Sequence, residues 1–165
     1  MMPMQYKGVN FEHNHVRQHV GVFDVSHMAQ ILIRGKRSFD FIQKITTNDV
    51  SKLIDGKVQY SCMLNLNGGI IDDLLVYRFH QDSYMLVVNA ANTEKDMNWI
   101  CAHNDMEVDV VNATPDRGLL AIQGPKTNFL LQKLTDIDLS SIPYYTFKIG
   151  EIANCPNVII SNTGY

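Results

Sequence analysis

The chain is most informative in the segment Asn65-Leu66-Asn67-Gly68-Gly69-Ile70-Ile71-Asp72-Asp73-Leu74-Leu75-Val76-Tyr77. Its Asn-x-Asn-Gly-Gly opening favours a tight hairpin turn, because these residues tolerate the positive φ that such a turn requires. The apolar run that follows is typical of a β-strand. Since side chains alternate faces along a strand, the two adjacent carboxylates, Asp72 and Asp73, are predicted to point to opposite sides of a sheet.

The Asp73 side of this strand carries apolar neighbours. Alternation places Ile71, Leu75 and Tyr77 on the same face as Asp73, so we expect this carboxylate to be partly shielded from water. A shielded carboxylate is costly unless another group pairs with it. Two interpretations follow: backbone or Arg hydrogen bonds to Asp73 with a purely structural role, or a carboxylate that serves a functional site.

Hydrophobic periodicity outward from this hairpin predicts a regular order of elements. Strands are expected over residues 28–33, 58–64, 70–77, 84–89 and 106–111. A helix with Phe39, Ile42 and Ile45 on one side follows the first strand, and a helix with Met97, Ile100 and Cys101 on one face precedes the last. This order predicts an α+β fold: an antiparallel sheet with a split βαβ (ferredoxin-like) unit and both helices on one face.

The flanking segments are predicted to contain a helix over residues 10–20, strands over 22–25 and 119–122, and a helix carrying Phe129, Leu130 and Leu134. The end of the chain, over residues 144–149 and 158–165, is predicted to be strand and turn. These elements would form part of a second, mostly β domain.

Composition restricts the class of protein. The chain has 165 residues, of which 45% are hydrophobic and 19% charged, and a net charge of −3, which suits one domain or two small ones. Without a basic run, neither nucleic acid nor a membrane surface is an expected partner. The sequence has no membrane span and no signal peptide at its start. Cys62, Cys101 and Cys155 are interpreted as reduced, mostly buried thiols.

Three other candidate motifs do not meet the requirements of their chemistry. His15 and His19 have metal-ligand spacing, but Val16 stands where a metalloprotease has Glu and no third ligand is evident, so no metal site is predicted. The segment Gly124-Pro125-Lys126-Thr127 lacks the glycine spacing of a phosphate loop and fits a strand-to-helix turn. Ser26 and His27 are adjacent, without a nucleophile elbow.

Seven collinear blocks stand out in the chain: Gly21-Val-Phe-Asp-Val-Ser-His-Met28, Thr47-Asn-Asp-Val50, Tyr60-Ser-Cys-Met-Leu-Asn65, Gly68-Gly-Ile-Ile-Asp-Asp-Leu74, Val87-Val-Asn-Ala-Ala-Asn-Thr-Glu-Lys-Asp96, Ala121-Ile-Gln-Gly-Pro125 and Thr163-Gly-Tyr165. Together they resemble the aminomethyltransferase (T-protein) family of the glycine cleavage system, and the match runs from about Met4 to the last residue. The Asp-Val-Ser-His-Met and Ile-Asp-Asp-Leu wording favours the glycine cleavage member over the wider superfamily of folate-dependent enzymes.

The resemblance implies a tetrahydrofolate-dependent enzyme. It would take an aminomethyl group from the dihydrolipoyl arm of a lipoyl carrier protein (H-protein), giving 5,10-methylenetetrahydrofolate and ammonia. Asp73 matches the catalytic Asp, and Met28, Tyr60, Val87 and Asn89 match other positions that line the folate pocket. The chemistry agrees, because a carboxylate near the pterin nitrogens can hold the nucleophile and offset positive charge on the methylene carbon.

The resemblance also implies a domain organisation. We expect residues 27–113 to form the split βαβ folate-binding domain, with residues 1–26 and 114–165 as two segments of an incomplete discontinuous domain. Family members are more than twice as long and continue Thr-Gly-Tyr with Thr-Gly-Glu, so we expect this chain to be a fragment, inactive by itself. The expected location is cytoplasmic in a bacterium, or the mitochondrial matrix in a eukaryote.

Other functions stay open at this point. One is a folate-binding accessory protein of the same fold that performs no transfer, another is a folate-dependent demethylase, and a third is an interaction domain without a ligand. The iron-sulfur assembly factor that resembles this family has a Lys-Gly-Cys-Tyr-type motif, which is not found here.

Overall fold

The computed structural model describes residues 3–164. Its helices and strands are α1 (Val9–Gln18), β1 (Gly21–Asp24), β2 (Ala29–Arg34), α2 (Ser38–Ile45), β3 (Val58–Leu64), β4 (Ile70–His80), β5 (Ser83–Val88), α3 (Thr93–Ala102), β6 (Asp109–Asn112), β7 (Leu120–Gln123), α4 (Thr127–Leu131), β8 (Thr146–Ile152) and β9 (Cys155–Asn162). Within this part of the chain, no helix is long and apolar enough to cross a membrane.

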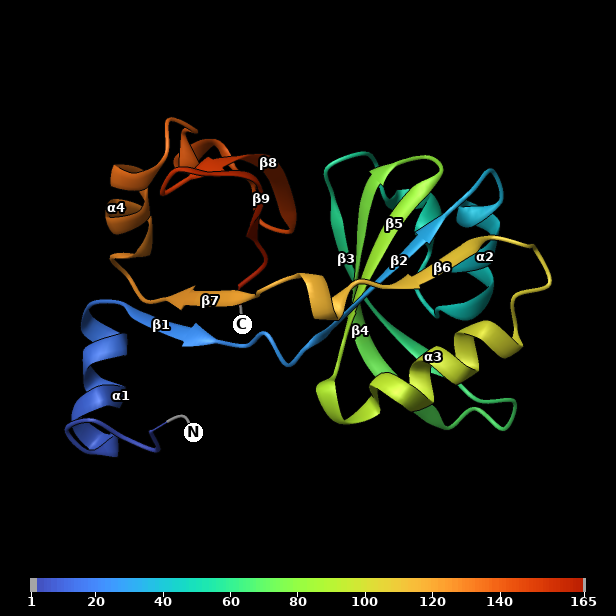
Figure 1. Ribbon diagram of the computed structural model, residues 1–165, viewed down its shortest axis with the longest axis horizontal. Coiled ribbons are helices and arrows are strands. Elements are labelled where there is room, and N and C mark those ends of the chain that lie inside the picture. Colours follow the sequence, from blue (N-terminus) through green and yellow to red (C-terminus); the bar gives the residue numbers. More distant parts are fainter. Residues whose placement is uncertain (1–2, 165) are drawn as a thin grey trace.

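The central feature is a five-stranded sheet with the order β3-β4-β5-β2-β6 (Figure 1). Every neighbouring pair of strands is antiparallel. Because β2 lies between β5 and β6, the segment β5-α3-β6 is a split βαβ unit. The predicted α+β fold and its order of strand, helix, three strands, helix, strand are confirmed.

The two helices α2 and α3 cover the same face of the five-stranded sheet, as predicted (Figure 1). Phe41, Ile42 and Ile45 of α2 and Ile100 of α3 are buried there against alternate side chains of the strands. The prediction that Cys101 shares this buried face is wrong. Cys101 is exposed near the end of α3, and the apolar stripe narrows to Ile100 with partly buried residues beside it.

The other two cysteines are also more exposed than predicted. Cys155 is exposed at the start of β9, and Cys62 is half-buried in β3. The interpretation of the three cysteines as mostly buried is therefore wrong. It relied on the usual burial of the residue type, whereas burial depends on which strand face a neighbouring element covers.

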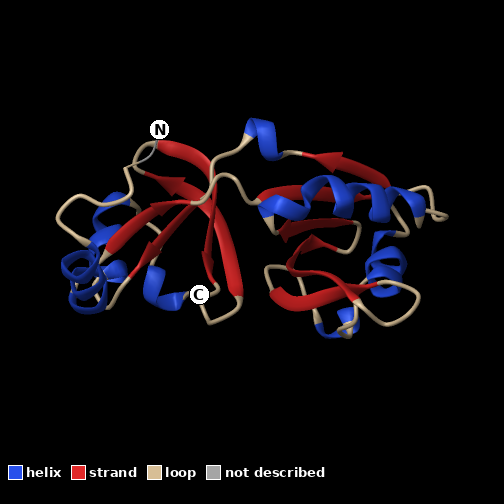
Figure 2. Cartoon of the chain, turned by 90° about the horizontal axis from the view of Figure 1, so that it is seen from below, coloured by secondary structure: helices blue, strands red, loops and turns tan. Residues whose placement is uncertain are grey.

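The second face of the sheet packs against the hairpin β8–β9. Phe147 is buried against Tyr77, with ring centroids 5.4 Å apart, and the Val58 N–H donates to the Tyr145 carbonyl at 2.9 Å. Figures 1 and 2 show β8 and β9 grouped with α1, β1, β7 and α4 beside the five-stranded sheet. The second core therefore joins the end of the chain to the central sheet.

The segments before and after the five-stranded sheet are joined by one short antiparallel ladder. Strand β1 pairs with β7 in antiparallel register, from Gly21 opposite Gln123 to Asp24 opposite Leu120. Neither α1 nor α4 contains a buried residue. The pairing joins a strand before the five-stranded sheet to a strand after it, and the domain limits stay a prediction.

Candidate functional site

A β-bulge orients the two adjacent carboxylates. In the ladder between β3 and β4, Met63 stands opposite Asp72 and Leu64 opposite Ile70, so Ile71 has no partner residue. Alternation had placed Ile71 on the Asp73 face, but it packs against the helix-side core. The extra residue of a bulge interrupts the period of two, which explains this error. Beyond the bulge, Asp72 and Asp73 face opposite sides as predicted.

Asp72 points toward the helices and is 4% exposed. Its carboxylate accepts hydrogen bonds from the Asn89 main-chain N–H at 2.9 Å, the Asn89 side-chain amide at 2.9 Å and the Asn92 side-chain amide at 2.6 Å. Burial acts to raise the pKa of Asp72, but the donors from Asn89 and Asn92 outweigh it and the pKa is lowered. Asp72 is therefore an ionised, well-bonded buried group.

Asp73 points to the opposite face and is exposed. The expected partial shielding is wrong, because the β4–β5 ladder begins only at Leu74 opposite Val88 and gives Asp73 no β5 partner. The Tyr60 hydroxyl donates to Asp73 Oδ2 at 3.1 Å, and the Asn89 amide donates to Oδ1 at 3.0 Å. The hydrogen bond to Asp73 raises the pKa of Tyr60, which keeps this donor neutral.

Asn89 connects the two carboxylates. Its side-chain nitrogen lies 2.9 Å from Asp72 Oδ1 and 3.0 Å from Asp73 Oδ1. Since both neighbours are acceptors, the nitrogen of the Asn89 amide must face them and its carbonyl oxygen must point elsewhere. The amide orientation is set by contacts on both faces of the sheet edge.

An apolar row lies beside Asp73 on the same face of the sheet. The register aligns Tyr60 with Leu75, Leu75 with Val87, and Val87 with Gln30 across four strands. Tyr60 is 49% exposed and Val87 is 8% exposed, so the row runs from an open edge into the second core. Met28 packs at the margin of that core.

The structure thus brings Asp73, Tyr60 and Asn89 into direct contact and places Val87 in the adjoining row. Leu75 lies on the Asp73 face as alternation predicted, whereas sequence reasoning missed Gln30 as a member of the same surface. Gln30 is 4% exposed, and its side-chain nitrogen has no hydrogen-bond partner within residues 3–164. Alternation along β2 from Met28 could have placed Gln30 on this face.

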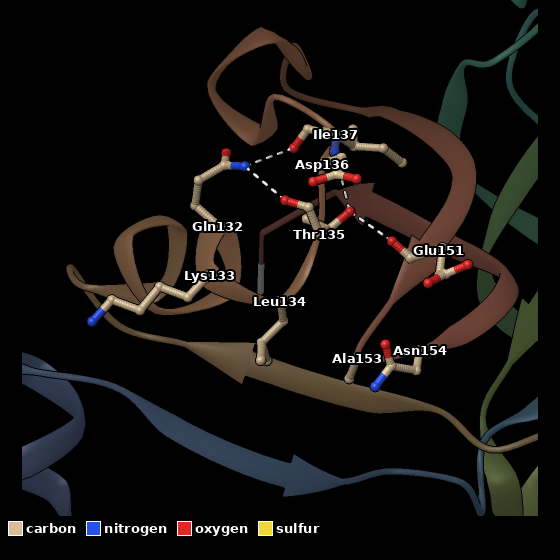
Figure 3. A pocket seen from close by; sticks show the side chains of 9 residues that line it. All are labelled: Gln132, Lys133, Leu134, Thr135, Asp136, Ile137, Glu151, Ala153 and Asn154. Carbon is tan, nitrogen blue, oxygen red and sulfur yellow. Dashed lines mark hydrogen bonds between the residues drawn. The ribbon is translucent and has the colours of Figure 1, made fainter.

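A separate cavity of about 580 Å³ lies at the far end of the β8–β9 hairpin (Figure 3). Two of its polar side chains are engaged locally: Gln132 Nε2 donates to the Thr135 and Ile137 carbonyls, and Thr135 Oγ1 donates to the Glu151 carbonyl. None of the residues proposed above lines it. It lies apart from the side chains that surround Asp73, so we place the candidate site at Asp73.

The part of the chain that the structure describes contains no group of three His, Cys, Asp or Glu side chains placed to hold a metal ion. The rings of the helical pair His15 and His19 lie tilted to each other with centroids 4.9 Å apart, and His19 Nδ1 lies 2.7 Å from the Lys126 ammonium. Lys126 lowers the pKa of His19 by charge repulsion. This neighbourhood is unsuitable for a cation.

Comparison with known families decides the membership of the chain. The model of the GCVT N-terminal domain matches residues 1–165. The chain belongs to the GCVT N-terminal domain family. The residues around Asp73 therefore belong to a GCVT N-terminal domain, and the antiparallel α+β architecture described above is that of the family.

Two bacterial relatives of this chain are both named aminomethyltransferase. This GCVT N-terminal domain is 56% identical over 164 residues to the aminomethyltransferase of Flavobacterium psychrophilum and 47% identical to that of Geobacillus thermodenitrificans. These alignments cover 99% of this chain and 46% and 45% of the two relatives. The chain thus spans about half the length of the curated relatives it matches.

Solved structures share the fold. The glycine cleavage system aminomethyltransferase T from Bartonella henselae superposes with a TM-score of 0.82 at 33% identity, over 88% of this chain and 40% of that one. A heterotetrameric sarcosine oxidase from Corynebacterium sp. U-96 superposes with a TM-score of 0.61 at 16% identity, over 90% of this chain and 75% of that one. The second likeness concerns the fold alone.

Proposed function

We propose that the chain supplies the folate-binding domain of a glycine cleavage aminomethyltransferase. The reaction would pass the one-carbon unit of an aminomethyl group, carried on a dihydrolipoyl protein, to tetrahydrofolate with release of ammonia. The observation that carries this proposal is the exposed Asp73 carboxylate, held by Tyr60 and Asn89 beside an apolar row. The names of the bacterial relatives support it. A cytoplasmic location is part of the proposal.

The residues fit a pterin. A pterin has a flat ring with hydrogen-bonding groups along its edge, and such ligands bind where apolar surface adjoins a few placed polar groups. Leu75, Val87 and the Tyr60 ring offer the apolar surface. The Asn89 carbonyl oxygen, which faces away from both carboxylates, would accept an N–H of the pterin edge.

Asp73 would have two effects. Its carboxylate oxygens accept hydrogen bonds, so Asp73 would hold the N–H of the attacking amine in line with the methylene carbon. It would also offset the positive charge that develops on that carbon. Tyr60 and Asn89 fix the carboxylate before the reaction, which reduces the reorganisation needed in the transition state.

A binding experiment tests the location. Tetrahydrofolate would be titrated into the ¹⁵N-labelled chain up to millimolar concentration, and amide shifts followed by NMR. We expect the largest shifts at Tyr60, Asp73 and Asn89, with little change around Gln132 at the separate cavity. Shifts centred on that cavity, or none near Asp73, would contradict the proposal.

A chimera tests the activity. The 164 aligned residues of this chain would replace the matching residues of the Flavobacterium psychrophilum relative, with which they are 56% identical. We expect this chimera to release ammonia from an aminomethylated lipoyl carrier when tetrahydrofolate is added. A chimera that binds folate without releasing ammonia would favour the accessory-protein alternative.

A further inference from the structure

A fully buried carboxyl lies behind the candidate site. Asp96, in the first turn of α3, is 0% exposed, although aspartate is rarely buried without a partner. Neither of its oxygens accepts a hydrogen bond from any donor within residues 3–164. No Lys, Arg or His nitrogen of these residues lies within 4.0 Å of it. An ionised Asp96 would therefore be an uncompensated buried charge.

The side chain nearest in effect is Asp72 of β4: hydrogen bonding between the two carboxyls lowers the pKa of Asp72 and raises that of Asp96. Two ionised carboxylates at contact distance repel each other, and neither can donate a hydrogen bond. One shared proton turns the same contact into an O–H···O⁻ hydrogen bond, which is among the strong kinds. The pair is therefore stable with one proton and one negative charge.

The surroundings decide which residue of the pair carries the proton. Asp72 accepts three N–H donors, from the Asn89 main chain, the Asn89 side chain and the Asn92 side chain, and these stabilise its charged form. Asp96 has no such donors. The proton therefore belongs on Asp96, whose O–H becomes a further donor to Asp72.

Electrostatics agrees with this assignment. Burial, together with the contact from Asp72, raises the pKa of Asp96 from 3.8 to about 7. Of the charged groups around it, Asp72 reaches it from β4 and Lys95 from α3, and Lys95 opposes the shift. The Lys95 ammonium is occupied elsewhere, because it donates to the carbonyl of the bulged Ile71 at 2.6 Å.

We propose that Asp96 is a protonated positioning residue, whose O–H donates a hydrogen bond to Asp72 so that Asp72 holds the Asn89 amide against Asp73. The chain of contacts runs from the core of the helix face to the exposed carboxylate on the other face. Its meaning for the reaction rests on the proposed function of Asp73. The contacts themselves do not, since they exist without folate.

An NMR titration of the 165-residue chain tests the inference without folate. The carboxyl carbons of Asp72 and Asp96 and the side-chain NH₂ of Asn89 would be followed as pH rises from about 4 to above 7. We expect Asp96 to titrate near neutral pH, Asp72 to remain ionised, and the Asn89 NH₂ resonances to move with the Asp96 midpoint. A purely structural buried acid would leave the Asn89 resonances unchanged.

Three variants extend the test. Asp96→Asn keeps a donor of similar shape, so we expect native Asn89 NH₂ shifts that no longer depend on pH in this range. Asp96→Leu removes the donor and should displace these resonances. Glu94→Gln is the matched control, because it removes an exposed acid from the same helix turn. It should change neither the Asn89 NH₂ shifts nor their dependence on pH.

Two results would overturn the inference. One is an Asp96 that titrates at the ordinary value of 3.8. The other is an Asp96→Asn variant whose Asn89 resonances are displaced as far as those of Asp96→Leu. If Asp96→Leu does not fold, the wild-type titration and Asp96→Asn still decide. No readout of this test involves folate, so its outcome does not depend on whether the chimera shows transfer activity.

Discussion

Asp73 lies on the open face of β4, where the Tyr60 hydroxyl and the Asn89 amide donate hydrogen bonds to its carboxylate. Alternation along β4 separates it from Asp72, and the structure confirms this. Its exposure, and its hydrogen bonds to Tyr60 and Asn89, depend on where β5 ends, one residue short of it. Because the Asp73 carboxylate is exposed, a bound substrate can contact it directly.

Replacing Asp73 by Asn in the chimera should lower turnover much more than it weakens folate binding. The charge would be used mainly in the transition state, so its loss affects kcat before ground-state affinity. Steady-state kinetics with tetrahydrofolate as the varied substrate measures both effects. Asp109→Asn, an exposed strand aspartate far from the site in the sheet order, is the matched control. Equal losses in kcat and affinity would contradict the assignment.

The effect expected for Asp72 changes once its contacts are known. From strand facing alone, Asp72→Asn should affect turnover less than Asp73→Asn. Asp72, however, accepts three hydrogen bonds in a buried place and orients Asn89. We therefore expect Asp72→Asn to lower the free energy of unfolding by about 2 kcal/mol, which thermal unfolding at neutral pH would show.

At the scale of elements, the contact between α3 and β4 makes stability depend on pH. The raised pKa of Asp96 means that the folded state keeps a proton that the unfolded chain releases. The free energy of unfolding should therefore fall as pH rises from about 4 to about 7 and then level off. Asp96→Asn should remove this slope. Chemical denaturation at several pH values measures it, and a slope unchanged in Asp96→Asn would rule out the assignment.

The junction of β7, α4 and α1 depends on a glycine. Gly124 has φ +129°, and a Cβ added there would lie 2.7 Å from the Val16 carbonyl oxygen, which belongs to the backbone of α1. Gly124→Ala should therefore cost the left-handed strain of about 1–3 kcal/mol and displace α1. Gly68→Ala is the control, because φ is +81° there and no atom lies within 4 Å of the added Cβ. Thermal unfolding should show the larger loss for Gly124→Ala.

At the scale of the whole molecule, stability should be uneven. The central sheet and its two helices contain most of the buried apolar residues, whereas α1 and α4 bury none. Amide hydrogen exchange should therefore be slowest in the strands of residues 28–112. Faster exchange in β5 than in α1 or β9 would contradict this expectation.

The open candidate site also sets an expectation for affinity. Binding pockets enclose most of a ligand's surface, whereas Asp73 and Tyr60 are exposed on one face of a sheet. The 165-residue chain by itself should bind tetrahydrofolate with a Kd near or above about 1 mM and show no detectable aminomethyl transfer. Isothermal titration calorimetry and an ammonia assay would check this. Micromolar binding would mean that other residues of this chain enclose the ligand.

Local patterns in the sequence were sufficient for the order of elements, the hairpin turn at Gly68 and the opposite facing of Asp72 and Asp73. Each depends on backbone preferences or on a short period, which act between near neighbours along the chain. The seven blocks that resemble the glycine cleavage aminomethyltransferases likewise required only residue order. Family membership and fold class followed from these features.

Only the tertiary structure decided what surrounds these residues. The bulge at Ile71 depends on the register with β3, the exposure of Asp73 on the end of β5, and the burial of Asp96 on the docking of α3 against β4. Sequence periodicity predicts which face a side chain takes, but burial and contact depend on which distant segment covers that face. The hydrogen bonds from Asp96 through Asp72 and Asn89 to Asp73 exist because a helix and two strands meet there.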